Sequence, residues 1–241
     1  MSILDDKLII AGPCSFASYN ELYKNALEIK KLGIKYLRAG AFKMRTNPNS
    51  FQGLREEGME MLLKVKEELG LKIVTEFTTI KQIEDYGDKV DIIQIGSRNM
   101  YNYELLKAAG RTKTPVLLKR GFSATYEEWL YAAEYIKNEG NTNIILCERG
   151  IRSAITSATR NVLDIQAIPY IKENTDYKII VDPSHASGLA YMVPSMSIAA
   201  IAAGADGLLI EAHYDPSISK SDSAQTIDMN TLKELINTLD R

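Results

Sequence analysis

Short runs of apolar residues recur along the chain at regular intervals, separated by longer segments of mixed polarity. The runs are rich in Ile, Val and Leu and show little alternation, which is typical of parallel strands buried on both faces. We therefore expect strands at residues 7–11, 35–38, 72–76, 92–95, 116–119, 144–147, 178–182 and 207–211.

Between these runs lie segments with helical periodicity, at residues 19–32, 54–69, 126–138, 193–203 and 229–239. Gly33, Gly70 and Gly140 stand where helix C-caps are expected. Eight strand–helix alternations are the count of a β/α barrel, and no Pro- or Ser-rich linker divides the chain. The sequence predicts an α/β fold, a single (β/α)8 TIM barrel spanning residues 1–241.

The composition is that of an ordinary globular enzyme, with 45% hydrophobic and 25% charged residues. A net charge of -2 gives no electrostatic footprint for nucleic acid or an anionic membrane. Asp5 and Asp6 lie where a signal peptide would be basic and then apolar. Two cysteines make no disulfide framework. We expect a cytoplasmic protein with neither a nucleic-acid nor a membrane partner.

Four residues of metal-ligand type follow apolar runs that barrel closure brings together. Cys14, His185 and Glu211 belong to the first, seventh and eighth predicted strands, and Asp222 lies in the loop after the last one. A thiolate, an imidazole and two carboxylates suit Mn, Fe, Co or Zn. Taken alone, Cys14 is also compatible with a packed thiol, and His185 with a histidine that is hydrogen-bonded in the core. The spacing along the chain leaves both interpretations open.

Three other residues have less specific contexts. His213 lies two positions beyond Glu211, so we expect it to face the same side and contact either a ligand residue or the substrate. Cys147 lies within an apolar strand and is interpreted as a packed thiol. Trp129 lies in an amphipathic segment and is expected to pack in the outer layer of the barrel.

Cations follow several of the predicted strands at their C-terminal ends, where barrel enzymes carry their chemistry. Buried cations that converge on one barrel mouth are costly unless paired, so they indicate an anionic ligand. The alternative is a set of salt bridges to Glu76, Glu148 and Asp182, but these carboxylates are fewer than the cations. The cations concerned are Arg38, Lys43, Arg45, Arg98, Lys119 and Arg149.

Six short motifs occur in order along the chain. They are Ala11-Gly12-Pro13-Cys14-Ser15, Phe42-Lys43-Met44-Arg45-Thr46, Ile95-Gly96-Ser97-Arg98-Asn99, Leu117-Leu118-Lys119-Arg120-Gly121, Cys147-Glu148-Arg149-Gly150 and Val181-Asp182-Pro183-Ser184-His185. Together they strongly resemble 3-deoxy-D-arabino-heptulosonate 7-phosphate (DAHP) synthase of the short type I-beta class, over nearly the whole chain. The resemblance implies condensation of phosphoenolpyruvate with erythrose 4-phosphate, the first step of the shikimate pathway.

The resemblance also implies roles for individual residues. Lys43, Cys14 and His185 would be catalytic, and Lys43 would give a proton to the developing alkoxide or steer the attacking water. The resemblance implies a homotetramer. It also implies that residues 1–241 form the catalytic barrel only, without a regulatory or chorismate mutase domain. The metal ligands would be Cys14, His185, Glu211 and Asp222; phosphoenolpyruvate would contact Arg38, Glu76, Arg98, Lys119 and Arg149; erythrose 4-phosphate would contact Lys43, Arg45, Thr46 and Asn47.

The segment that would meet the aldehyde departs from the family pattern. The usual Lys-Pro-Arg-Thr-Ser-Pro is replaced here by Lys43-Met44-Arg45-Thr46-Asn47-Pro48. Loss of the first proline frees one φ angle, and Asn47 replaces a hydroxyl that would face the sugar phosphate. Ser97 stands where alanine is usual, which is a minor change. The identity of the aldehyde is the property that these changes affect.

Two other functions are compatible with this fold. 3-Deoxy-D-manno-octulosonate 8-phosphate (KDO8P) synthase shares the barrel and chemistry but uses arabinose 5-phosphate. That family carries Lys-Ala-Asn-Arg at the aldehyde segment and lacks the Gly-x-Arg-Asn and Lys-Arg-Gly motifs. A phosphosugar-binding protein that has lost catalysis is the third possibility, and the complete set of four metal-ligand residues argues against it.

Overall fold

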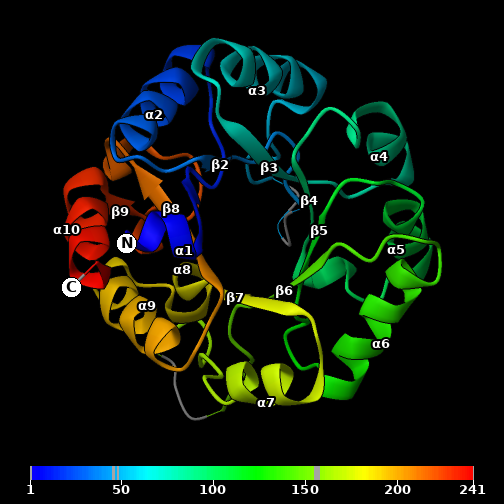
Figure 1. The fold of residues 1–241 in the computed structure, drawn as a ribbon. Helices are drawn as coiled ribbons and strands as arrows, with labels where there is room; N and C mark the ends of the chain where they lie inside the picture. Colours follow the sequence, from blue (N-terminus) through cyan, green and yellow to red (C-terminus); the bar gives the residue numbers. More distant parts are fainter. Residues whose placement is uncertain (1, 45–46, 48, 155–157, 241) are drawn as a thin grey trace.

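The strands of this protein form a closed parallel barrel, and helices surround it (Figure 1). The structure is a computed structural model that describes residues 2–44, 47, 49–154 and 158–240. Strands pair in sequence order from β1 to β8, and β1 then pairs with β8, with Ile10 opposite Leu209. The predicted (β/α)8 TIM barrel is therefore confirmed.

Every predicted strand is present, and each boundary lies within one or two residues of its expected place. The last barrel strand runs on to His213 because it pairs beyond the barrel with a short ninth strand, which the sequence pattern did not predict. The strands are β1 (Leu8–Gly12), β2 (Tyr36–Arg38), β3 (Lys72–Glu76), β4 (Ile92–Ile95), β5 (Val116–Lys119), β6 (Ile144–Glu148), β7 (Lys178–Val181), β8 (Gly207–His213) and β9 (Ile227–Asp228).

The five predicted helices are also present, with ends shifted by at most one residue. The helices are α1 (Ile3–Asp6), α2 (Tyr19–Lys31), α3 (Arg55–Leu69), α4 (Ile80–Tyr86), α5 (Tyr103–Gly110), α6 (Tyr126–Lys137), α7 (Ala167–Asn174), α8 (Pro183–Ser187), α9 (Val193–Ala202) and α10 (Met229–Leu239). Short 3-10 turns are η1 (Ser97–Asn99), η2 (Ala190–Met192), η3 (Pro216–Ile218) and η4 (Ser223–Gln225).

Local sequence signals account for several helix ends. Thr125 and Glu128 form a reciprocal capping box at the start of α6. Gly70 ends α3 with φ 66, a left-handed conformation that other residues adopt only with strain. Gly33 and Gly140 likewise have positive φ just after α2 and α6, as predicted.

The barrel interior is apolar in its middle and polar toward the C-terminal ends of the strands. Its apolar filling consists of Ile10, Val74, Ile92, Leu117, Ile145, Cys147, Ile180 and Leu209. Side chains in a strand alternate between faces, so the next inward-facing position lies two residues further on. Those positions hold Arg38, Glu76, Gln94, Lys119, Asp182 and Glu211. The period of two thus places a layer of polar and charged side chains directly above an apolar layer. Cys147 belongs to the apolar filling and is fully buried, so it is a packed thiol.

Arg120 lies one residue beyond Lys119 and faces the outer layer instead. Its Nη1 donates to Glu148 Oε2 at 3.0 Å and to Asp164 Oδ2 at 2.7 Å. Its guanidinium also lies 5.9 Å from the ring centroid of Trp129, which is fully buried in the outer layer as predicted. Arg120 therefore joins β5, β6 and the segment before α7 as part of the framework.

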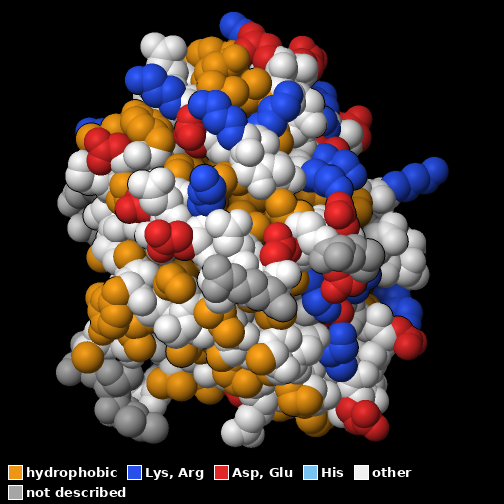
Figure 2. Space-filling model, turned by 60° about the vertical axis from the view of Figure 1, so that its left-hand side comes forward, with side chains coloured by type: hydrophobic (Ala, Val, Ile, Leu, Met, Phe, Trp, Pro, Cys, Tyr) orange, Lys and Arg blue, Asp and Glu red, His pale blue; other side chains and the backbone are white. Residues whose placement is uncertain are grey.

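The outer surface is unevenly charged. In Figure 2, Lys, Arg, Asp and Glu side chains gather over the upper part and along the right-hand edge, whereas the lower left part is mainly hydrophobic or uncharged. α9 contains no charged residue, and Ile198 on it is 40% exposed. Among the described residues, no helix is both long and apolar enough to cross a membrane.

We predict that Arg120→Met lowers the free energy of unfolding by about 3–5 kcal/mol, because it leaves Glu148 buried without its charged partner. Urea unfolding followed by circular dichroism measures the change. Arg111→Met is the matched control, since Arg111 pairs with Glu139 at the surface and such pairs contribute about 0–1 kcal/mol. Equal losses in the two variants would contradict a framework role for Arg120.

Candidate active site

A cavity of about 260 Å³ opens at the C-terminal ends of the strands. Six of its lining residues are cations and two are carboxylates, so the cavity is strongly positive. Its lining includes Arg38, Lys43, Met44, Asn47, Ser50, Glu76, Ser97, Arg98, Lys119, Phe122, Arg149, Arg160, His185 and Asp222. An anionic ligand is what such a lining is built to bind.

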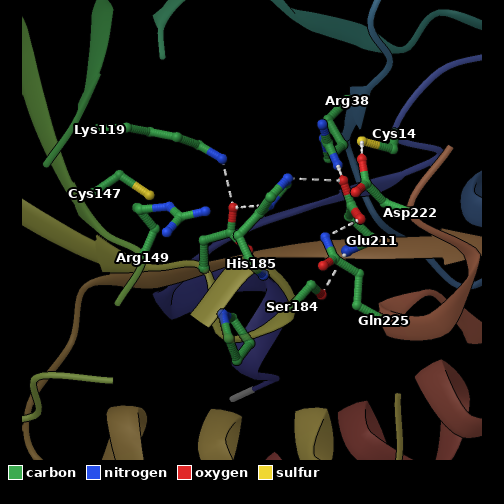
Figure 3. Close-up of polar contacts among 12 residues, drawn as sticks. Cys14, Arg38, Lys119, Cys147, Arg149, Ser184, His185, Glu211, Asp222 and Gln225 are labelled. Atoms are coloured by element: carbon green, nitrogen blue, oxygen red, sulfur yellow. Dashed lines mark hydrogen bonds and ion pairs between the residues drawn. The ribbon is translucent and has the colours of Figure 1, made fainter. Parts of the chain in front are cut away.

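The structure brings together Cys14, His185, Glu211 and Asp222 beside this cavity (Figure 3). One ligand atom from each lies within 4.8 Å of all the others. Cys14 Sγ is 3.0 Å from Asp222 Oδ2, and His185 Nε2 is 3.3 Å from Glu211 Oε1. The group is a possible metal-binding cluster, and its mixed S, N and O donors suit a borderline divalent ion.

The orientation of His185 is set by Asp182, which caps the short helix α8. Asp182 Oδ1 accepts the backbone N–H of His185 at 2.9 Å, and its Oδ2 lies 2.7 Å from His185 Nδ1. A carboxylate only accepts, so Nδ1 carries the proton and Nε2 keeps a lone pair. Burial lowers the pKa of His185 to about 4, which keeps the ring neutral.

This tautomer leaves two acceptors facing each other, since the lone pair of His185 Nε2 points at Glu211 Oε1. Arg38 Nη1 donates to the same oxygen and offsets part of its charge. Two acceptors at 3.3 Å still repel each other, and a cation bound by both would remove this repulsion. The local geometry itself therefore fits a bound metal ion.

The charges of the other three ligand residues differ. Burial alone would raise the pKa of Glu211, but the nearby His185 and Arg38 outweigh it and lower that pKa to about 2. The pKa of Asp222 is also lowered, since Lys43 outweighs the effect of burial. Burial and the charge of Glu211 raise the pKa of the Cys14 thiol to about 12.

Asp222 adopts φ 54, a left-handed conformation that is rare outside glycine. Asp tolerates it better than most residues, but strain of this kind concentrates at functional sites. The backbone of Asp222 thus supports a special role for this position.

Lys43 lies at the edge of the cluster and faces the cavity. Its Nζ is 2.7 Å from Cys14 Sγ and 3.8 Å from Asp222 Oδ2. Burial by itself lowers the pKa of Lys43, but Cys14 and Glu211 outweigh it, so that the pKa is raised. A protonated amine therefore stands next to the candidate metal ligands.

Arg38 and Lys119, like Lys43, are paired with carboxylates. Arg38 Nη1 donates to Glu211 Oε1, and Lys119 Nζ donates to Asp182 Oδ2, both at 2.5 Å. The salt-bridge interpretation thus holds for Lys119 and Asp182, although Lys119 still lines the cavity.

Arg149 is different, because it forms no ion pair with any residue in the described part of the chain. It is 3% exposed, donates weakly to the carbonyl of Gly150 at 3.3 Å and lies 4.8 Å from the Phe122 ring centroid. Burial lowers its pKa to about 10. A buried cation without a carboxylate partner indicates that an anionic ligand neutralises its charge. Arg98 also lies over Phe122, at 5.4 Å.

Other predicted residues have different outcomes. Arg45 and Thr46 lie outside the described residues. Asn47 lines the cavity, as does Glu76. The prediction for His213 is wrong: its Nε2 bonds Glu21 of α2 at 3.2 Å, and its Nδ1 accepts the N–H of Asp215. Ala212 and His213 at the end of β8 pair with β9, outside the eight-stranded barrel, and His213 there contacts α2 and not the cavity.

Three residues of the site were not assigned a role from the sequence. Asp182 was considered only as a salt-bridge partner, although its spacing from His185 matches an N-cap. Arg160 lies in the loop after β6 and lines the cavity. Its position after the C-terminal end of a barrel strand could have indicated this from the sequence. Gln225 donates to Glu211 Oε2 at 2.6 Å, and nothing in its local sequence indicates this.

Comparison with known proteins identifies the family of this chain. A model of the DAHP synthetase I family matches residues 4–240. Phospho-2-dehydro-3-deoxyheptonate aldolase of Thermotoga maritima is 49% identical over 228 residues, covering 95% of this chain and 67% of that protein. A 2-dehydro-3-deoxyphosphooctonate aldolase of Koribacter versatilis is 30% identical over 252 residues, covering 96% and 89%.

Solved structures give the same result. The crystal structure of the Thermotoga maritima aldolase, described as a DAHP synthase, superposes with a TM-score of 0.92 at 48% identity, covering 96% of this chain and 68% of that one. A truncated form of the Thermotoga enzyme gives 0.89 at 46% identity, covering 96% and 84%. The fold and the site together define a TIM-barrel aldolase with a possible metal-binding cluster. The chain belongs to the DAHP synthetase I family.

We predict that Arg149→Met leaves the ligand-free protein at least as thermally stable as the wild type, because an unpaired buried cation is removed. Binding of phosphoenolpyruvate should weaken by about 2–4 kcal/mol, through loss of a desolvated guanidinium contact. Scanning calorimetry and isothermal titration measure the two effects. A loss of stability as large as that of Arg120→Met would instead place Arg149 in the framework.

Proposed function

We propose that this protein condenses phosphoenolpyruvate with erythrose 4-phosphate to give DAHP and phosphate, the first step of the shikimate pathway. The observation that carries the proposal is the cavity itself. It is lined both by the buried Arg149, which has no ion pair among the described residues, and by His185 and Asp222 of the Cys/His/Glu/Asp cluster. One side of the cavity suits a small dianionic substrate, and the other suits a polarised carbonyl. The 49% identity to the Thermotoga aldolase supports the same reaction.

Phosphoenolpyruvate carries a phosphate and a carboxylate, and the proposed site offers it several cations on rigid strands. Arg98, Lys119 and Arg149 approach the cavity from β4, β5 and β6. Arg38 and Glu76 contribute from β2 and β3. These residues would hold the enol with its C3 directed at the aldehyde, which removes much of the entropic cost of the encounter.

The reaction forms a bond between C3 of phosphoenolpyruvate and the aldehyde carbon. Water then adds at C2 and gives up a proton. The bond between C2 and the phosphate oxygen breaks, the C2 hydroxyl loses its proton to become the ketone oxygen, and phosphate leaves with a proton. A divalent ion, which we propose to be Mn, Co, Fe or Zn held by Cys14, His185, Glu211 and Asp222, would polarise the aldehyde. Lys43 would deliver a proton to the aldehyde oxygen as it becomes an alkoxide, since its raised pKa keeps it charged beside the cluster.

The aldehyde is proposed to lie against the segment between β2 and α3. Met44, Asn47 and Ser50 line this side of the cavity, and the backbone N–H of Lys43 donates to the carbonyl of Gln52 at 2.9 Å. Arg45 and Thr46 belong to the same segment and would meet the sugar phosphate. Arabinose 5-phosphate is the weaker candidate, because the octonate aldolases reach only 30% identity.

Location and assembly belong to the same proposal. The two cysteines are both free and buried, which suits a reducing cytoplasm. We propose a homotetramer. The uncharged outer face of α9, with Ile198 exposed, supports self-association.

The test is an assay of metal-stripped protein with phosphoenolpyruvate and either aldehyde. We expect phosphate release only after Mn, Co, Fe or Zn is restored, because the aldehyde is otherwise not activated. The value of kcat/KM should be at least about tenfold higher with erythrose 4-phosphate than with arabinose 5-phosphate. Full activity in metal-stripped protein would refute the metal dependence. A higher kcat/KM with arabinose 5-phosphate would refute erythrose 4-phosphate as the substrate.

The aldehyde segment gives a further prediction. Met44→Pro with Asn47→Ser should lower KM for erythrose 4-phosphate roughly two- to fivefold, because a suitable proline removes about 0.4–1 kcal/mol of chain entropy. Asn47 Oδ1 accepts the N–H of Asn49 at 3.0 Å, and a serine hydroxyl can take over this turn contact. Steady-state kinetics measure the change. Loss of activity would mean that this segment is fitted to another aldehyde.

A further inference from the structure

The two carboxylates of the candidate metal cluster use their oxygens differently. Glu211 Oε1 lies 3.3 Å from His185 Nε2, and Asp222 Oδ2 lies 3.0 Å from Cys14 Sγ, so these two oxygens face the cluster. Glu211 Oε1 also accepts from Arg38 Nη1, which leaves it a second lone pair for the cluster. The other oxygen of each acid faces away and accepts a hydrogen bond from outside it. Each carboxylate thus has an inner and an outer oxygen.

Two residues hold the outer oxygens, and they also bond each other. Gln225 Nε2 donates to Glu211 Oε2 at 2.6 Å, visible in Figure 3. Arg160 Nη1 donates to Asp222 Oδ1 at 3.0 Å and to Gln225 Oε1 at 2.8 Å. Asp222, Arg160, Gln225 and Glu211 therefore form one continuous chain of hydrogen bonds.

The chemistry of the groups fixes the direction of this chain. A guanidinium only donates and a carboxylate only accepts, so the amide of Gln225 has to present its oxygen to Arg160 and its NH2 to Glu211. Gln225 is 2% exposed, which leaves it little freedom to turn. A glutamate at this position could accept from Arg160 but could not donate to Glu211, and a methionine has no amide group for either contact.

The backbones of both residues are anchored close to the ligands. The N–H of Arg160 donates to the carbonyl of Ser187 in α8 at 2.9 Å. Gly188 follows α8 with φ +73, and a Cβ there would lie 2.6 Å from the Cβ of Arg160. The N–H of Gln225 donates to the carbonyl of Asp222 at 3.2 Å. The loop after β6, the helix α8 and the loop after β8 are thus tied together at this point.

We propose that Arg160 and Gln225 are positioning residues of the metal centre. By holding one oxygen of Asp222 and one of Glu211, they make each carboxylate present a single, preoriented oxygen to the ion and so raise metal affinity. The inference rests on the metal centre of the proposed function and adds two residues that are not themselves ligands. Groups that orient ligands in this way typically contribute about 10–100-fold to metal affinity.

The experiment titrates metal-stripped protein with Co²⁺ alone, without substrates. Absorption from thiolate-to-cobalt charge transfer reports binding at Cys14, and competition with a chelator gives Kd. We expect Gln225→Met and Arg160→Met each to raise Kd about 10–100-fold. The double variant should show nearly the same rise as one single variant, because both act through one chain of bonds. Arg160→Lys should restore part of the affinity.

Arg111→Met is the matched control, because it also removes an arginine that is paired with a carboxylate, but far from the cavity. Its Kd for Co²⁺ should equal that of the wild type. Circular dichroism of the metal-free variants verifies folding, and should Arg160→Met not fold, Gln225→Met and Arg160→Lys carry the test. Unchanged Kd in the folded variants overturns the positioning role.

The outcomes separate this inference from the function on which it rests. Wild-type protein that shows no thiolate band with Co²⁺ refutes the metal centre, and the positioning role with it. Wild-type protein that binds Co²⁺ and condenses both substrates, while Gln225→Met binds Co²⁺ equally well, refutes the positioning role alone.

Discussion

Compensation of charge buried at the C-terminal end of the barrel is the constraint on which the site depends. Arg38, Lys119, Asp182 and Glu211 are each at most 5% exposed, and charges at such positions are costly unless they are paired. Two ion pairs, Arg38 with Glu211 and Lys119 with Asp182, meet this cost within the protein. The guanidinium of Arg149 has no ion-pair partner among the described residues, and the lone pair of His185 Nε2 still faces Glu211 Oε1. A substrate anion would neutralise the first, and a metal ion would relieve the second.

The alternation of side chains along each strand divides these charges into two sets with different roles. Lys119 and Arg120 are neighbours in sequence, yet Lys119 faces the cavity and Arg120 is locked into the outer layer by Glu148 and Asp164. Glu148 and Arg149 show the same division on β6 in reverse order. A shift of one residue in register would exchange the framework and the site.

The site combines a tightly determined part with a more variable one. The ligand cluster is held by hydrogen bonds from rigid elements: Asp182 fixes His185, and Gln225 fixes Glu211. The side proposed to bind the aldehyde is formed by the segment between β2 and α3, where Met44 is 37% exposed. We therefore expect substitutions in this segment to disturb the Cys/His/Glu/Asp cluster less than substitutions at Asp182 or Gln225.

The sequence by itself determined the elements and most of the candidate site. Apolar runs gave all eight barrel strands, because burial on both faces leaves a local signature, and residues at the strand ends necessarily meet at one mouth. Tertiary structure alone decided the direction of His213, the outward role of Arg120 and the link from Arg160 through Gln225. Arg160 and Asp222 are 62 positions apart, and no local period encodes a hydrogen bond between two loops. Such contacts exist only once the barrel has closed and brought the loops after β6 and β8 together.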